Sequence, residues 1–341
     1  MTSRNKINIS ILISIIILGI ILFILNLFVG SVTIPFSDLF NVFFGEESNP
    51  TVRTIVMDYR LPQAVTAMFA GAALSIAGLL MQTLFRNPLA DPSMLGISSG
   101  AGLGVAITIL LTGILGGSAL STMSTWSNLG VSLAAFAGAT LVLMLILGFS
   151  SRVRNMTTLI IIGLMISYLA GSLTDIMKFF SMKEDIHAFV IWGMGSFSAV
   201  GTSKLMFFST SITIGLVASL FISKNMNIIL LGDLYAENLG INIKRNNLFI
   251  ILISGYLTAI VTAYCGPIAF LGLAIPHLTR FIFKTSDHRI LTPAVMLIGV
   301  VVSLLCNLVA RMPGFEGNLP INAVTAFIGA PVVIWVILRK R

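Results

Sequence analysis

Ten long apolar runs, joined by short polar connections, limit what this chain of 341 residues can fold into. Their approximate limits are 7–29, 62–84, 94–115, 127–149, 158–179, 204–223, 247–267, 269–284, 291–310 and 321–338. An α-helix of about 20 apolar residues crosses the hydrocarbon core of a bilayer. Because lipid cannot satisfy backbone polar groups, such segments cross it as internally bonded helices. The sequence therefore predicts an all-α integral membrane protein with about ten transmembrane helices in a single domain, 1–341.

The composition favours a membrane protein over a soluble one. Hydrophobic residues make up 57% of the chain and charged residues only 9%, against roughly 25% charged residues in soluble domains. The run 7–29 is long for a signal-peptide core and has no small-residue cleavage site after it, so we interpret it as a retained span. The eighth run, 269–284, is short and contains Pro276, and a Gly266-Pro267 turn precedes it.

The basic residues are distributed unequally between the two sides of the predicted bundle. With the N-terminus in the cytoplasm, fourteen of the 20 fall on the inner side: Arg4, Lys6, Arg86, Arg152, Arg154, Lys224, Lys244, Arg245, Arg280, Lys284, Arg289, Arg339, Lys340 and Arg341. The other six fall on the outer side: Arg53, Arg60, Lys178, Lys183, Lys204 and Arg311. Lysine and arginine in short loops collect on the cytoplasmic side. The distribution therefore predicts both termini in the cytoplasm, and it places there the polar, proline-containing elbow "RNPLADPSMLGISSGAGLG" (86–104).

Several function classes lack their characteristic residues. The two cysteines, Cys265 and Cys306, stand alone in apolar runs, and the three histidines are scattered, so we predict no metal site and no cofactor. No G-x-x-x-x-G-K-[ST] motif is present, so the chain is not expected to hydrolyse ATP, and no intramembrane catalytic cluster indicates an enzyme. The net charge of +8 follows the membrane pattern above and does not indicate a nucleic-acid partner.

An ion-coupled secondary transporter of a small solute is the alternative from another class. Such a carrier needs buried ionisable residues along its path. Asp175 and Lys178 stand three residues apart near the outer end of the fifth run, and we expect them to neutralise each other. No ladder of buried carboxylates is evident.

Glycines recur every four residues at the start of the third run. Gly96, Gly100 and Gly104 fall on one helix face and would allow another backbone to approach closely. Helix packing accounts for this pattern, and a lining of a transport path would use the same small residues.

A cytoplasmic loop at about 224–247 contains the stretch "LGDLYAENLG" (231–240), which reads as a short amphipathic helix. Leu234 and Leu239 lie near one face, Asp233 and Glu237 form an i, i+4 pair on another, and Gly240 suits a helix end. The helix is either a solvated surface element or a knob that fits a groove on a soluble partner.

Two arginines, Arg60 and Arg311, each stand on the outer side just before an inward-going span. A charge buried at mid-membrane costs roughly 2.5–3.5 kcal/mol on insertion scales, so we expect both to lie at the rim. They either anchor the chain at the interface or form a basic rim that docks acidic groups of a partner.

Taken together, these segments resemble the FecCD-type permease subunits of ABC importers for iron-siderophores, haem and cobalamin. The stretches that carry the resemblance are "RLPQAVTAMFAGAALSIAGLLMQTLFRNPLADPSMLGISSGAGLG", "WGMGSF", "LGDLYAENLG", "GPIAFLGLAIPHLTR", "SDHR" and "LPINAVTAFIGAPVVIW", between residues 60 and 335. The resemblance implies the BtuC-like ABC importer permease fold in a bacterial inner membrane. It also implies a second permease copy (a homodimer), two cytoplasmic ATPase subunits, an extracytoplasmic substrate-binding protein and a translocation path at the dimer interface.

The resemblance also implies roles for particular residues. Residues of the loop match the coupling helix that sits in the ATPase cleft: Gly232, Asp233, Ala236, Leu239 and Gly240. Residues of the elbow and of the start of the fifth run match the cytoplasmic gate: Asn87, Leu89, Thr157 and Thr158. Arg60 and Arg311 match positions that meet acidic residues of the binding protein. Gln63 stands where the family often has a second arginine, and Asn318 where it often has glutamate, so docking here would use fewer charges.

The function that follows is the transmembrane permease subunit of an importer for a metal chelate, a ferric siderophore, haem or cobalamin. A partner subunit would hydrolyse the ATP. The spans lack a carboxylate, histidine or thiolate cage, which argues against a free metal ion as the substrate.

Overall fold

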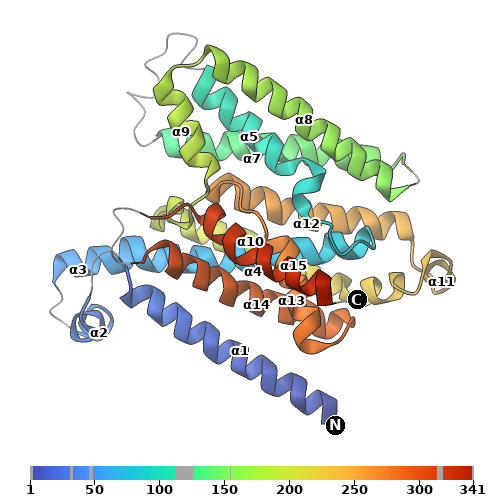
Figure 1. Cartoon of the computed structure of the whole chain (residues 1–341), viewed down its shortest axis with the longest axis horizontal. Coiled ribbons are helices and arrows are strands. Elements are labelled where there is room, and N and C mark those ends of the chain that lie inside the picture. Colours follow the sequence, from blue (N-terminus) through green and yellow to red (C-terminus); the bar gives the residue numbers. More distant parts are fainter. Residues whose placement is uncertain are drawn as a thin grey trace.

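The computed structural model describes residues 3–30, 34–45, 49–111, 126–153, 155–312 and 318–339, and throughout them the regular structure is helical, without a strand. The helices are α1 (Ser3–Phe28), α2 (Phe36–Phe44), α3 (Pro50–Thr54), α4 (Leu61–Leu84), α5 (Ile97–Ala106), α7 (Trp126–Ser150), α8 (Met156–Phe180), α9 (Lys183–Gly193), α10 (Thr202–Ile229), α11 (Asp233–Asn238), α12 (Ile243–Cys265), α13 (Leu271–Phe283), α14 (His288–Ala310) and α15 (Ile321–Arg339). Figure 1 shows them in sequence colours.

The ten predicted spans all appear as apolar helices. Among the described residues, seven helices are long and apolar enough to cross a membrane: Asn8–Phe28, Pro50–Leu84, Leu129–Ser150, Met156–Phe180, Thr202–Ile229, Ile243–Cys265 and His288–Ala310. Three shorter apolar helices occupy the places of the remaining runs: Ile97–Leu111, Leu271–Phe283 and Ile321–Trp335. The second span is longer than expected, because α3 continues through the π-helical segment Ile55–Arg60 into α4.

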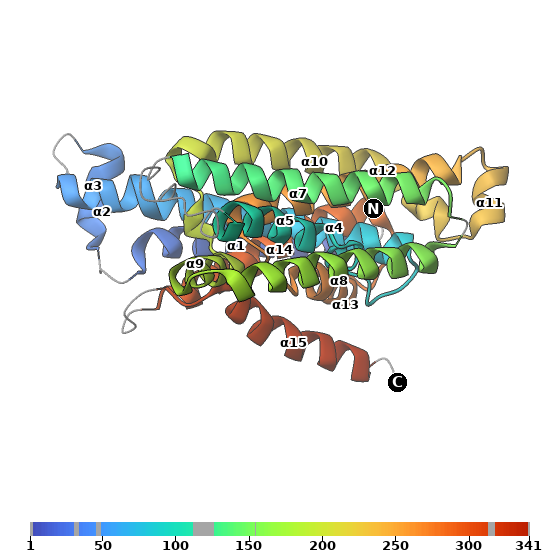
Figure 2. The same cartoon turned by 90° about the horizontal axis from the view of Figure 1, so that it is seen from above.

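The long helices run roughly along one axis, and the connections gather at the two ends (Figure 1). The first turn of α1, the last turn of α15 and the short helix α11 lie at one end, and α2 and α3 lie at the other, as the view from above also shows (Figure 2). We call these the inner end and the outer end, after the predicted orientation. Three of the basic residues assigned to the inner side, Arg154, Lys340 and Arg341, lie outside the described residues.

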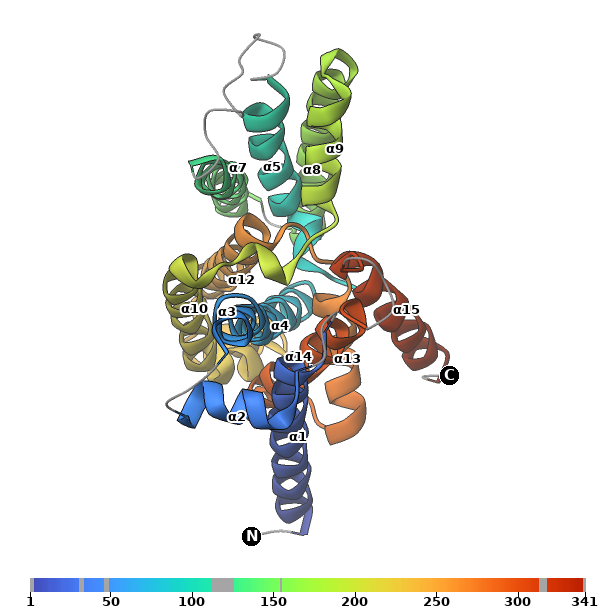
Figure 3. The ribbon, with the colours of Figure 1, turned by 90° about the vertical axis from the view of Figure 1, so that its left-hand side faces the viewer.

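The helix α4 forms the centre of the molecule. It is buried along nearly its whole length, and α10, α12, α13 and α14 pack around it (Figure 3). Glycines permit the closest crossings: a side chain at Gly78 would run into the carbonyl of Gly272 on α13, and one at Gly71 into that of Gly299 on α14. Small residues at helix contacts let backbones approach and gain dispersion energy in a medium as apolar as their own surfaces.

A second group, α5, α7, α8 and α9, lies on one side of the bundle in the end-on view, where α7 packs against α12 (Figure 3). Here the glycine pattern of the third run is confirmed as a packing face. A Cβ at Gly100 would lie 2.6 Å from the carbonyl oxygen of Gly138, and one at Gly104 would run into that of Ala134, both on α7. Gly96 faces α8 instead, where a Cβ would lie 2.8 Å from the carbonyl oxygen of Gly163.

The proline in α13 is compensated by a side chain of α4. Pro276 has no N–H for the carbonyl of Gly272, one turn earlier. Gln82 Nε2 donates to Gly272 O at 3.5 Å and to Leu273 O at 3.2 Å, and Gln82 Oε1 accepts from Arg280 Nη1 at 2.5 Å. One buried glutamine therefore satisfies both the freed carbonyls and the cation of α13.

Candidate functional site

The short helix α11 projects beyond the inner end of the bundle (Figures 1 and 2). Gly232 precedes it at φ +112° and Gly240 follows it at φ +84°, both in the region of φ that favours glycine. The N–H of Gly240 donates to Glu237 O at 2.9 Å and that of Ile241 to Ala236 O at 3.0 Å, so the helix stops where the sequence predicted.

This helix presents an apolar surface to solvent. Ala236 is fully buried against the bundle. The large apolar side chains point outward, with exposed fractions of 62% for Leu231, 78% for Leu234, 68% for Tyr235 and 62% for Leu239. Both leucines that the sequence placed near one face, Leu234 and Leu239, are thus available to a partner. Large apolar side chains that are this exposed on a short helix beyond the bundle are a candidate contact surface for a partner.

An ion pair connects α11 with the elbow. Arg86 Nη2 pairs with Asp233 Oδ1 and donates to Ile229 O at 3.2 Å. Arg86 itself has a left-handed backbone, φ 47°, because the chain turns sharply after α4. Arg86 was predicted to lie on the inner side, at the start of the elbow, but its pairing with Asp233 was not predicted, because the two residues are 147 positions apart.

Local hydrogen bonds hold the elbow in a tight turn. Asn87 Oδ1 accepts from Leu89 N at 3.0 Å, and Asp91 Oδ1 accepts from Ser93 N at 2.9 Å at the start of the 3-10 turn Pro92–Leu95. Such Asx turns are the usual role of Asn and Asp in proline-rich loops. Burial raises the pKa of the Asp91 carboxyl, and the bonds from Ser93 oppose that shift. Asn87 and Leu89 are both exposed at the inner surface.

The proline-containing helix α13 contacts the elbow through one histidine. His277 Nε2 bonds the carbonyl oxygen of Pro88 at 2.6 Å, and since a carbonyl only accepts, the ring donates from Nε2. This contact was not predicted. Its one signal in the sequence is that His277 directly follows Pro276 in the stretch that carries the family resemblance.

The other gate candidates, Thr157 and Thr158, lie exposed in the first turn of α8, also at the inner end. Asn155 caps this helix by accepting from Thr157 N at 2.9 Å. The elbow packs farther along α8, where a Cβ at Gly163 would lie 2.5 Å from Met94 O. The elbow, with Asn87 and Leu89, therefore packs against α8, the helix whose first turn contains Thr157 and Thr158.

Arg60 lies at the outer end and is buried, with an exposed fraction of 4%, which the expected position at the rim did not specify. Its Nη1 donates to Leu27 O at 2.8 Å and to Phe28 O at 2.6 Å. These carbonyls end α1 and have no partner in their own helix, and a cation is favourable there. Arg60 is buried because α1 packs beside the start of α4, which a sequence pattern does not reveal.

Arg311 is also buried, with an exposed fraction of 6%, and belongs to a polar network that joins α1, α4 and α14. Its Nη2 donates to Asn26 O at 2.7 Å and Asn26 Oδ1 at 2.9 Å, and its Nη1 to Gln63 Oε1 at 3.3 Å. Asn307 completes the network, accepting from Gln63 Nε2 at 3.0 Å and donating to Asn26 Oδ1 at 2.8 Å. Arg311 Nε has no partner among the described residues. Burial, together with the charge of Arg60, lowers the pKa of Arg311 to about 10, so it stays charged at neutral pH.

Both arginines nevertheless line one cavity of ≈ 410 Å³ at the outer end. Its other lining residues are Gly30, Ile55, Asp58, Tyr59, Gln63, Ser198, Val200 and Asn318. The two positions where the chain departs from the family pattern, Gln63 and Asn318, therefore face the same space as the two cations. One acidic residue, Asp58, lines the cavity with them.

Residues 17–339 match the family model described as the FecCD transport family. Among curated proteins, the vitamin B12 import system permease protein BtuC of Klebsiella pneumoniae is 34% identical over 298 residues, covering 87% of this chain and 86% of that protein. BtuC of Escherichia coli O9:H4 is 33% identical over 299 residues, covering 87% of each chain.

A solved structure shares the architecture. It is an inward-facing conformation of a transporter described as a metal-chelate type ABC transporter, with a TM-score of 0.83 and 29% sequence identity, covering 97% of this chain and 99% of that one. The predicted permease fold is therefore confirmed over almost the whole chain.

Proposed function

This chain belongs to the FecCD transport family and is a permease subunit of an ABC importer of the metal-chelate or cobalamin type. We propose that it carries a large chelate across a bacterial inner membrane, with cobalamin as the first candidate. Ferric siderophores and haem are the other candidate substrates. Vitamin B12 permeases at 33–34% identity support the choice of cobalamin.

The observation that carries the proposal is the exposed apolar face of α11 at the inner end. We propose that Gly232, Asp233, Ala236, Leu239 and Gly240 form the coupling helix for a separate ATPase subunit. The 62% exposure of Leu239 and 78% exposure of Leu234 leave apolar area that a partner's groove would cover. Two glycines at positive φ fix the direction in which this knob projects.

The elbow and the start of α8 form the proposed cytoplasmic gate, with Asn87, Leu89, Thr157 and Thr158 as its residues. The Arg86–Asp233 pair ties the elbow to the coupling helix, so a displacement of α11 by an ATPase would pull on the elbow. Gating then resembles the movement of one rigid element against another around a few loop residues.

At the outer end we propose that the cavity of ≈ 410 Å³ receives an acidic side chain of a substrate-binding protein. Arg311 and Arg60 both line the cavity and outnumber its one acidic lining residue, Asp58, so the cavity carries a net positive charge. Two copies of the permease domain 1–341, as a homodimer with a path between them and two ATPase subunits below, complete the proposed assembly.

Uptake by reconstituted vesicles tests this function. The chain, its ATPase and its binding protein would be combined, and labelled cobalamin, haemin and a ferric siderophore offered with ATP, without ATP and with a non-hydrolysable analogue. We expect uptake of one chelate that requires both ATP hydrolysis and the binding protein.

Uptake that ignores ATP but follows an ion gradient would reject this proposal in favour of a secondary transporter. ATP-dependent uptake of haemin or the siderophore alone would retain the importer and reject cobalamin as its substrate.

A further inference from the structure

A polar pocket of ≈ 400 Å³ lies between the end of α10 and the start of α12, at the inner end of the bundle. It is lined by Asn225, Gly240, Ile241, Asn242, Arg245, Asn246 and Phe249. None of these residues except Gly240 belongs to the proposed coupling, gating or docking groups.

One residue that lines this pocket carries an unused hydrogen-bond donor. Asn246 is buried, with an exposed fraction of 4%, and its Oδ1 accepts from Asn225 Nδ2 at 3.1 Å. Its own amide nitrogen, Nδ2, is buried and has no partner among the described residues. Because a buried amide N–H without an acceptor is unfavourable, this group favours a ligand with acceptor oxygens.

The pocket is also positively charged. Arg245 stacks over the ring of Phe249, with its Cζ 5.6 Å from the centroid, and makes no ion pair within the described structure. Lys224 and Lys244 are exposed at the same ends of α10 and α12 but do not line the pocket. An anion with several oxygens, such as a phosphodiester, suits this set of donors.

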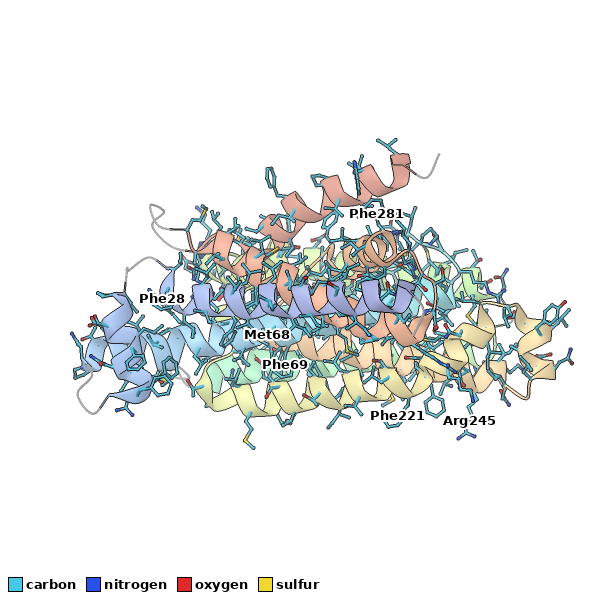
Figure 4. All side chains as sticks on the ribbon, turned by 90° about the horizontal axis from the view of Figure 1, so that it is seen from below. Phe28, Met68, Phe69, Phe221, Arg245 and Phe281 are labelled. Carbon is cyan, nitrogen blue, oxygen red and sulfur yellow. The ribbon has the colours of Figure 1, made fainter. Side chains whose placement is uncertain are left out.

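A second, apolar groove lies farther toward the middle of the bundle. It has a volume of ≈ 310 Å³, lies between the same two helices and is lined by Ile214, Gly215, Ala218, Leu252, Ile253 and Tyr256. Leu252 follows Arg245 by seven residues, about 10 Å along an α-helix. Phe221 and Arg245 project on the same side of the bundle in Figure 4, and Phe221 is 80% exposed.

The boundary between polar and apolar sequence falls at the same level on both helices. In α12 the polar stretch Lys244–Asn247 gives way to apolar residues from Leu248, and in α10 the apolar stretch ends at Ile222, before Lys224 and Asn225. This is the level at which phospholipid headgroups meet acyl chains, and basic pockets between spans on the cytoplasmic side hold anionic headgroups.

We propose that this site binds one anionic phospholipid, with its phosphodiester on Arg245 and the amide of Asn246 and an acyl chain in the groove beside Ala218. A free phosphate would use only the pocket. A neutral lipid would use only the groove. An occupant that reaches from Arg245 to the apolar groove needs both an anionic headgroup and an acyl chain, which selects a charged lipid. The inference does not depend on the proposed substrate, since it needs only a membrane-embedded chain; among the residues that line the pocket, only Gly240 also belongs to the proposed coupling loop.

Native mass spectrometry of the full chain in detergent, titrated with phosphatidylglycerol or phosphatidylcholine, measures the binding. We expect phosphatidylglycerol to bind roughly fivefold more tightly than phosphatidylcholine, given about 1 kcal/mol per basic group near a headgroup. Arg245→Gln should remove that preference. Lys244→Gln is the matched control: it deletes the same charge from the neighbouring residue, which does not line the pocket, and should keep the preference.

The groove has its own pair of variants. Ala218→Phe fills the groove and should weaken both lipids, whereas Val217→Phe, at a position 44% exposed and outside the groove, should leave both unchanged. Equal binding of the two lipids by the unmodified chain would overturn the proposal, as would equal effects of Arg245→Gln and Lys244→Gln. Displacement of the lipid by millimolar inorganic phosphate would replace it with a site for the free anion.

Discussion

At the residue scale, the molecule places its polar side chains where helix ends leave backbone groups without partners. Arg60 covers the last carbonyls of α1, and Gln82 covers the carbonyl that Pro276 frees in α13. In an apolar medium no water is present to bond an unsatisfied polar group. Removing one of these side chains would therefore leave buried carbonyls without a donor, which is more costly than the loss of the same bond at a solvated surface. Both side chains therefore stabilise the packing of the helices, whatever role they have in transport.

Gln82→Leu tests this reasoning in α13. The substitution removes the donor to Gly272 O and Leu273 O and the acceptor of the buried Arg280, so we expect a loss of about 2–4 kcal/mol in unfolding free energy. Thermal denaturation in detergent measures it.

A second substitution provides the control. Pro276→Ala restores an N–H to α13, so Gln82→Leu should cost less in the Pro276→Ala background than in the unmodified chain. Equal losses in both backgrounds would mean that Gln82 does not compensate the proline.

Single substitutions in the outer cavity test the proposed docking of a binding protein. Arg311→Gln and Arg60→Gln each remove one charge from the outer cavity, and we expect each to weaken capture of the binding protein several-fold at low salt and less at high salt, because salt screens such charges. Arg53→Gln, an exposed position outside the cavity, is the control. If all three substitutions weaken capture of the binding protein equally, docking depends on the net charge of the outer surface and not on the cavity.

At the scale of the element, α11 shows how a helix too short to be stable alone is held in place. Ala236 packs into the bundle, Asp233 pairs with Arg86, and Gly240 ends the helix in a left-handed conformation. Short helices depend on tertiary contacts because nucleation is unfavourable. The fixed geometry keeps apolar side chains pointing away from the bundle, which is the arrangement a partner's groove requires.

Gly240→Val tests this element. A Cβ there would meet no atom within 4 Å, so the change acts through backbone strain alone, since φ is +84°. We expect the ATPase to co-purify poorly with the variant, while helical content by circular dichroism stays unchanged.

Gly201→Val is the matched control, because Gly201 has equally open space and an ordinary φ of −74° at the outer end. It should leave the complex intact. Normal co-purification and transport by Gly240→Val would reject the coupling role of this loop.

At the scale of the whole molecule, the helices form one bundle with two distinct ends. The distribution of basic residues predicts which end faces the cytoplasm. Cys265 and Cys306 are buried, with exposed fractions of 2% and 0%, so native thiols should give little background labelling. Orientation can therefore be read from single introduced cysteines.

Thr51→Cys in α3 and Asn238→Cys in α11 place exposed thiols at opposite ends. In intact cells, or in spheroplasts where an outer membrane is present, an impermeant maleimide should label Thr51→Cys at once and Asn238→Cys only after the membrane is permeabilised. The reverse pattern would invert the topology and with it the assignment of gate, coupling loop and docking cavity.

Much of this architecture follows from the sequence alone. Hydropathy located all ten apolar helices, because a bilayer imposes length and composition on each span separately. The glycine spacing of the third run indicated close packing, and Gly240 indicated the end of α11, because both depend on local geometry. The Asp175–Lys178 pair, three residues apart, is likewise present at 3.1 Å.

Contacts between distant segments were decided only by the tertiary structure. Arg86 with Asp233, His277 with Pro88, and Arg311 with Asn26 are separated by more than a hundred residues, and no periodicity along the chain encodes such pairs. For the same reason the sequence did not reveal that Arg60 and Arg311 are buried at the outer end. Whether a polar side chain faces water or a neighbouring helix end depends on which helices pack beside it. Sequence fixes what each helix is able to bury, and packing decides which partner it meets.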